Sequence, residues 1–107
     1  MNSYFTVRRR FEAGCVDLAC SPKQHGHLYR IEATAEAHEA GMLRSSLDAF
    51  VREVDLRMLS EQLPGVNPTP MGISRFFMER TKMAVPSLCR VEVDISNVDE
   101  SWYAAEE

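Results

Sequence analysis

Cys15, His25 and His27, in the first third of the chain, are of types that bind transition metals. His25 and His27 are separated by one residue, and Cys15 precedes them on an apolar segment. Two histidines at positions i and i+2 of a strand project to the same side, so both imidazoles can reach one ion. Zinc accepts imidazole nitrogen and thiolate sulfur in a tetrahedral shell. Three such ligands would leave a fourth position open for water or substrate, as in catalytic zinc sites.

The same three residues also fit a purely structural interpretation, in which the histidines are hydrogen-bonded core residues and Cys15 is a buried thiol. Cys20 lies in the loop before His25. A thiolate beside a metal or a cation becomes a nucleophile or base, but a loop cysteine without a role fits equally well. Cys89 falls on the apolar face of a later strand, which favours packing. An odd cysteine count without a secretion signal predicts free thiols or metal ligands rather than disulfides.

Strict alternation of apolar and polar residues predicts the strands that position these side chains. The first strand covers Phe5 to Cys15, and the second runs from about Gln24 to Glu36. His25 and His27 share parity with the apolar face of the second strand, so we expect them to project inward, side by side. The segment 38–41 is expected to be a turn that ends the hairpin.

From Met42 the apolar residues recur at three- and four-residue steps, which predicts an amphipathic helix ending near Leu63. Thr69 and Pro70 form a typical helix start, and the second helix should end before Pro86. A last strand follows over residues 89–95, with a further short strand expected near 102–103. The sequence therefore predicts one α+β domain over residues 1–107, an antiparallel sheet with two helices packed on one face.

Composition excludes several classes of protein. The chain has 107 residues and a net charge of -4, and the negative charge argues against broad nucleic-acid binding. The run Arg8 to Arg10 is better explained as a strand edge or a subunit contact. No apolar stretch approaches the roughly 20 residues that span a bilayer, and no signal peptide is recognisable, so we expect a cytoplasmic protein. A small sheet has open edges, and we expect homo-oligomers that join through them into a larger barrel.

Several motifs, in this order, resemble the 6-pyruvoyl-tetrahydropterin synthase and 6-carboxy-tetrahydropterin synthase family. The segment Phe11 to Cys15 is similar to the family's F-x-A-A-H, and Cys20 followed by the segment His25 to Tyr29 is similar to its cysteine, short loop and H-G-H-x-Y. Further matches are the family's turn, its N-P-T motif and its aromatic C-terminal segment, at Gly41-Met42, Asn67-Pro68-Thr69 and Ser101-Trp102-Tyr103.

The resemblance implies the tunnelling fold, with subunits joined into a barrel and active sites between them. Family members bind zinc through three histidines and transfer protons with a cysteine and an Asp-His pair. For this chain the resemblance therefore implies a zinc site at Cys15, His25 and His27, with Cys15 in place of the third histidine. It also implies catalytic roles for Cys20 and Asp55.

This chain departs from the family pattern at several positions. Leu56 stands where the family has the histidine of its Asp-His pair, and leucine cannot transfer a proton. The glutamate that grips the pterin corresponds to Ile95 or, with a shift of one residue, to Asp94, which could bind substrate. Met71 stands where many relatives have a glutamate. These changes indicate a pocket that accepts something less polar than a pterin.

Three functions remain open from the sequence. The first, which we prefer, is a repurposed metal-dependent lyase, cyclase or isomerase with Cys20 or Asp55 as acid or base. Its substrate would be a small, less polar, non-pterin molecule of specialised biosynthesis. The second is a non-catalytic ligand-binding or structural subunit with a degraded active site. The third is an ordinary pterin-forming enzyme whose missing groups come from elsewhere, which Leu56 and Ile95 oppose.

Overall fold

The described strands form one five-stranded sheet. The computed structural model describes residues 2–17, 21–96 and 101–105, except the side chains of 15–17, 21–26, 101 and 102. Two long antiparallel strands, β1 (Tyr4–Asp17) and β2 (Ser21–Glu36), are extended on the β2 side by β4 (Arg90–Ile95) and β5 (Ser101–Ala105). The short β3 (Arg57–Met58) pairs in parallel with β1 and gives the order β3-β1-β2-β4-β5. In the described residues the predicted antiparallel sheet is correct except at this two-residue pair.

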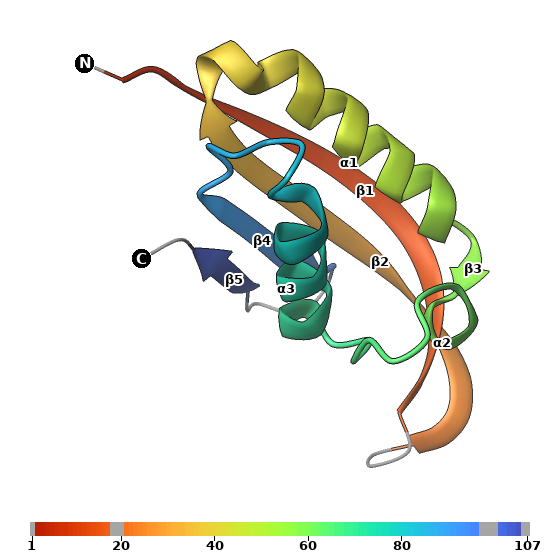
Figure 1. Cartoon of the computed structure of the whole chain (residues 1–107). Coiled ribbons are helices and arrows are strands. Elements are labelled where there is room, and N and C mark those ends of the chain that lie inside the picture. Colours follow the sequence, from red (N-terminus) through yellow and green to blue (C-terminus); the bar gives the residue numbers. More distant parts are fainter. Residues whose placement is uncertain (1, 18–20, 97–100, 106–107) are drawn as a thin grey trace.

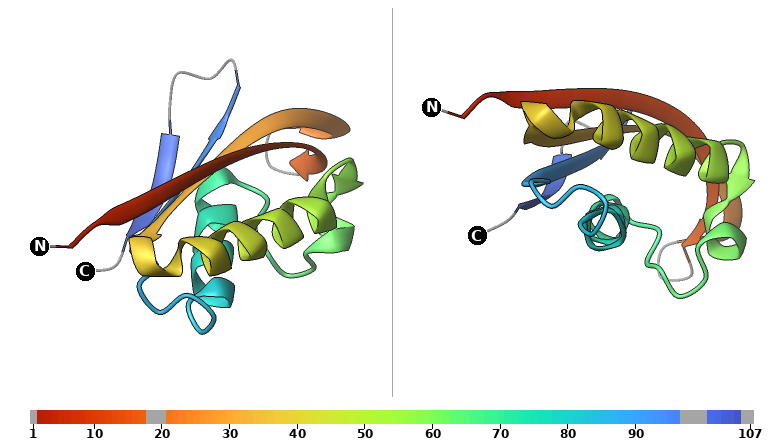
Figure 2. Two further views of the ribbon diagram at one scale, coloured as in Figure 1. Left: turned by 90° about the horizontal axis from the view of Figure 1, so that it is seen from above. Right: turned by 45° about the horizontal axis from the view of Figure 1, so that its top comes forward.

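Both longer helices lie on the same face of the sheet (Figures 1 and 2). The helix α1 (Ala40–Val54) packs on β1, and α3 (Pro70–Thr81) packs on β4 and β5. The buried residues of α1 recur at three- and four-residue steps and are Leu43, Leu47, Phe50 and Val54. The predicted α+β architecture, with two helices on one face, is confirmed. None of the described helices is both long and apolar enough to cross a membrane.

The start of α3 is fixed by local hydrogen bonding and close packing. The Thr69 hydroxyl accepts the backbone N–H of Gly72 at 3.1 Å, and Pro70 occupies the first helical turn. Gly72 carries no side chain, and a β-carbon there would collide with the backbone oxygen of Asn67. The loop before α3 can therefore lie directly against the helix.

Aromatic residues join the sheet to the helices. Phe11 on β1 stacks on Tyr29 of β2 with ring centroids 5.0 Å apart, and Phe50 of α1 meets Phe77 of α3 edge to face at 5.3 Å. All four side chains are almost completely buried. The opposite face of the sheet is polar and carries charged pairs such as Arg8 with Glu32 at 2.8 Å.

The first helix ends earlier than its apolar period predicts. It stops at Val54, and the chain then forms β3 and a short helix, α2 (Leu59–Gln62). The break is made by β1, because the Glu12 N–H donates to the Asp55 carboxylate at 2.9 Å and the Glu12 carbonyl accepts from the Leu56 N–H at 2.6 Å. The turn expected over 38–41 is instead a 3-10 turn, η1 (Ala37–Glu39), that leads directly into α1.

Candidate functional site

A cavity of about 450 Å³ lies where β1, β2 and β3 meet. The hairpin of β1 and β2 extends beyond α1 and α3 at this end of the sheet (Figure 1). The described residues that line the cavity come from all three strands and the turn before β3, and are Glu12, Ala13, Gly14, His27, Leu56, Arg57 and Met58. Its volume lies in the range typical of small-molecule sites, roughly 300–1,000 Å³.

The backbone register brings the predicted metal ligands to neighbouring positions of the hairpin. Cys15 is the register partner of His25, and Ala13 is the partner of His27. The α-carbons of Cys15, His25 and His27 therefore occupy two rows of one strand pair, separated by the row of Gly14 and Gly26. Two imidazoles and a thiolate form a donor set that zinc accepts. The side chains of Cys15 and His25, and all of Cys20, lie outside the described residues.

His27 is the one predicted metal ligand whose side chain the structure describes. It is half-buried, lines the cavity, and meets the Tyr29 ring edge to face at 5.9 Å. Among the described side chains, no group of three or more His, Cys, Asp and Glu could hold a metal ion. The predicted set of ligands depends on Cys15 and His25, so it stays a prediction.

Leu56, at the position where the family pattern has a proton-transferring histidine, lines the cavity, whereas Asp55 does not. Asp55 is half-buried, and its carboxylate accepts the Glu12 N–H. The described residues that line the cavity do not include Asp55, whereas the next residue, Leu56, is 76% exposed and forms part of the wall. Asp55 therefore shapes this wall by fixing the turn to β1, and its predicted catalytic role stays a prediction.

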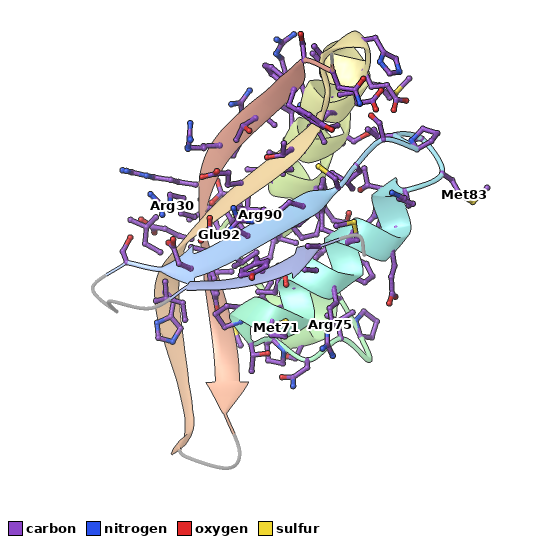
Figure 3. The ribbon with its side chains drawn as sticks, turned by 90° about the vertical axis from the view of Figure 1, so that its left-hand side faces the viewer. Arg30, Met71, Arg75, Met83, Arg90 and Glu92 are labelled. Atoms are coloured by element: carbon purple, nitrogen blue, oxygen red, sulfur yellow. The ribbon has the colours of Figure 1, made fainter. Side chains whose placement is uncertain are left out.

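Asp94 lies on the polar face of the sheet, opposite the cavity. Its carboxylate accepts from the Arg30 guanidinium at 2.6 Å, and this hydrogen bond raises the pKa of Arg30. Figure 3 shows Arg30 on the side of the sheet away from α3. Ile95 is the register partner of Tyr29, so it shares the parity of His27. Within one chain Asp94 and His27 lie on opposite faces, and a substrate-binding role for Asp94 is a prediction for a site shared between subunits.

The substitutions that we grouped into one pocket are separated in this structure. Leu56 lines the cavity beside His27, but Met71 lines a second cavity of about 390 Å³ along α3, together with Arg75 and Phe76. Figure 3 shows Met71 and Arg75 together on α3. Within a single chain, Leu56 alone among the three changes lines the cavity beside His27.

Solved structures that cover 97% or more of this chain are similar to it. The 6-pyruvoyl tetrahydropterin synthase of Caenorhabditis elegans has a TM-score of 0.80 and 12% identity, with 100% of this chain and 97% of that chain covered. The synthase of Plasmodium falciparum has a TM-score of 0.65 and 8% identity, with 98% of each chain covered. The uncharacterized protein WS1659 from Wolinella succinogenes has a TM-score of 0.58 and 13% identity, covering 97% of this chain and 99% of that one.

The chain has the 6-pyruvoyl tetrahydropterin synthase fold. No family model matches the sequence, and no curated protein matches it by sequence. The structural likeness confirms the fold that the sequence motifs predicted. At these identities it is a likeness of fold.

Within the 6-pyruvoyl tetrahydropterin synthase fold, two residues that line the cavity beside His27 were not predicted from the sequence. The apolar spacing predicts that Arg57 and Met58 continue the amphipathic helix, but they form β3 and line the cavity beside Ala13 and Gly14. The break depends on Leu56 at φ 60°, a conformation that leucine rarely adopts. A leucine at this position does not indicate a turn, so the sequence alone did not predict it.

Proposed function

We propose that the chain is a diverged 6-pyruvoyl tetrahydropterin synthase-like enzyme of the cytoplasm, a metal-dependent lyase, cyclase or isomerase. Its substrate would be a small molecule less polar than a pterin, of the kind used in specialised biosynthesis. The observation that carries this proposal is the cavity in which half-buried His27 lies beside Ala13, Leu56 and Met58. A mostly apolar pocket with few polar groups is the usual form of a small-molecule site.

In this proposal Cys15, His25 and His27 hold a zinc ion. Bound zinc supplies Lewis-acid polarisation of a substrate oxygen or of water. Support comes from the donor set and from the register, which pairs Cys15 with His25 two residues along β2 from His27. Cys20 or Asp55 would act as the acid or base. The Asp55 carboxylate is held in place by the Glu12 N–H.

Metal content tests this proposal directly. Protein expressed with added zinc should contain stoichiometric metal by elemental analysis, and His27→Ala should lose it. His38→Ala is the matched control, because His38 lies on η1, is mostly exposed and pairs with Glu36 at 3.4 Å. Metal-free wild-type protein, or a His27→Ala variant that retains its metal, would contradict a zinc site at these residues.

We also propose that the chain forms homo-oligomers with sites between subunits. Asp94 would then contribute to a site completed by another copy. Support comes from its position on the face without helices and from the two sides of the sheet. One side ends at β5, and on the other β3 pairs with β1 only at Ala13 and Gly14.

A non-catalytic ligand-binding subunit is the second candidate, and Leu56 is the observation that favours it. In the family pattern a proton-transferring histidine follows the aspartate, whereas here an exposed leucine lines the cavity. Metal-free protein that still binds small ligands would support this candidate. Conversion of dihydroneopterin triphosphate would contradict both candidates and restore the pterin-forming enzyme.

A further inference from the structure

Arg57, Ala13 and His27 form one row across three strands at the cavity. Ala13 is the register partner of His27 on β2 and also of Arg57 on β3. Register partners carry their side chains on the same face of a sheet, and neighbouring strands lie about 4.8 Å apart. The α-carbons of Arg57 and His27 are therefore about 10 Å apart, with the small Ala13 side chain between them.

Arg57 brings a positive charge to this cavity. Among the described residues, five other arginines pair with carboxylates, namely Arg8, Arg9, Arg30, Arg80 and Arg90, and four do not, namely Arg10, Arg44, Arg52 and Arg75. In the part of the chain that the structure describes, no carboxylate pairs with Arg57, although Glu12 lines the same cavity. Arginine presents a planar fork of donors that matches carboxylate and phosphate oxygens.

Two apolar side chains lie beside this charge. Leu56 and Met58 flank Arg57 along the chain and line the cavity with it. A ligand held there would contact hydrocarbon along its length, a guanidinium at one end and an imidazole at the other. Because the two α-carbons are about 10 Å apart, the ligand between these side chains must be small.

We propose that this cavity binds a small molecule with an apolar body and one terminal oxyanion, which Arg57 holds while the opposite end reaches His27. The proposal rests on the proposed function and names the substrate class of the same site. The oxyanion is a carboxylate or a phosphate, which arginine recognises by the same pair of hydrogen bonds.

Three probes of equal chain length test this proposal by calorimetric titration of the whole protein: hexanoate, hexyl phosphate and hexanamide. The wild-type protein should bind hexanoate or hexyl phosphate at least about tenfold more tightly than neutral hexanamide, the size expected for a charged hydrogen bond. Arg57→Gln should abolish that preference and leave hexanamide binding unchanged. The tighter of the two anions identifies the natural oxyanion.

Arg75→Gln is the matched control, since Arg75 is exposed on α3 and lines the other cavity. It removes the same charge and should retain the preference for anions. Equal binding of hexanamide and both anions by the wild-type protein, equal loss in the two variants, or no detectable binding of any probe would overturn the proposal.

Metal analysis of the same samples separates this inference from the proposed function. Arg57→Gln should retain its metal, because arginine is not among the proposed ligands. Metal-free protein with an Arg57-dependent anion preference would support the anion site and contradict the metalloenzyme. Metal-loaded protein that binds all three probes equally would contradict the anion site and leave the metalloenzyme standing.

Discussion

Leu56 holds a backbone conformation that costs free energy. Its φ of 60° lies in the left-handed region, where an L-residue is less stable by roughly 1–2 kcal/mol. Two backbone groups of Glu12 hold the turn, one through the Asp55 carboxylate and one through the Leu56 N–H. The strain places an apolar side chain at the cavity wall, so it serves the shape of the candidate site.

Leu56→Gly should therefore stabilise the protein by about 0.5–1 kcal/mol, since glycine adopts positive φ without a steric cost. Little packing is lost, because the leucine is 76% exposed. Urea unfolding at equilibrium measures the change. Leu56→Ala retains the β-carbon and the strain, and should bring no such gain. Equal stabilisation in both variants would show that loss of the exposed side chain, and not relief of φ, is responsible.

At the scale of elements, the hairpin could be predicted from sequence and the segment after α1 could not. Alternation along β1 and β2 places apolar residues such as Phe11 and Ile31 inward, and both are buried. The apolar spacing that predicts α1 continues past Val54 through Met58 and Leu59, although the helix does not. Its end depends on hydrogen bonds to Glu12, a residue distant in sequence, and no local pattern reports such bonds.

In the candidate site too, contacts between residues distant in sequence could not be predicted from local patterns. The i, i+2 spacing correctly predicted that His27 lies on the cavity side of β2. The sequence did not predict that Arg57 lines the cavity, because this depends on the pairing of β3 with β1. Asp94 and Ile95 were equivalent candidates in sequence. The pairing of β2 with β4 puts them on opposite faces, because Arg30 and Tyr29 are their respective partners.

Glu39 connects η1 to the segment between α3 and β4 and should make stability depend on pH. Hydrogen bonds from Ser87 lower the pKa of its carboxyl from the ordinary 4.5. A carboxyl with a lower pKa in the folded state stabilises the protein above the unfolded value, and this contribution disappears as pH falls through the folded value. Glu39→Gln should therefore lower Tm near neutral pH and lose less Tm than wild type on acidification below 4.5.

Calorimetric Tm values from about pH 7 down to pH 3 provide the measurement. Glu61→Gln, at an exposed position of α2, is the control and should follow the wild-type curve. If Glu39→Gln also parallels wild type across the acid range, then the hydrogen bonds from Ser87 do not contribute to the pH dependence of folding.

At the scale of the whole molecule, β1 is an open edge for most of its length. The N–H and C=O of Glu12 both bond to the segment after α1, so they point away from β2. In an antiparallel strand the direction of these groups alternates along the chain. The backbone groups of Tyr4, Thr6, Arg8 and Arg10 therefore point away from β2 as well, and in the described structure β3 covers β1 only at Ala13 and Gly14.

Unpaired edge groups of this kind are templates for another strand, and the proposed barrel would use them. Arg10→Pro removes one outward N–H without removing a donor to β2, so it should block association while the monomer folds. The wild-type protein should then have a mass that is a multiple of 12.2 kDa by light scattering, and Arg10→Pro should have the mass of one chain. Arg10→Ala removes the charge but retains the N–H, and should associate like wild type. A monomeric wild-type protein would contradict the barrel, and an Arg10→Pro variant of wild-type mass would show that association does not depend on this edge of β1.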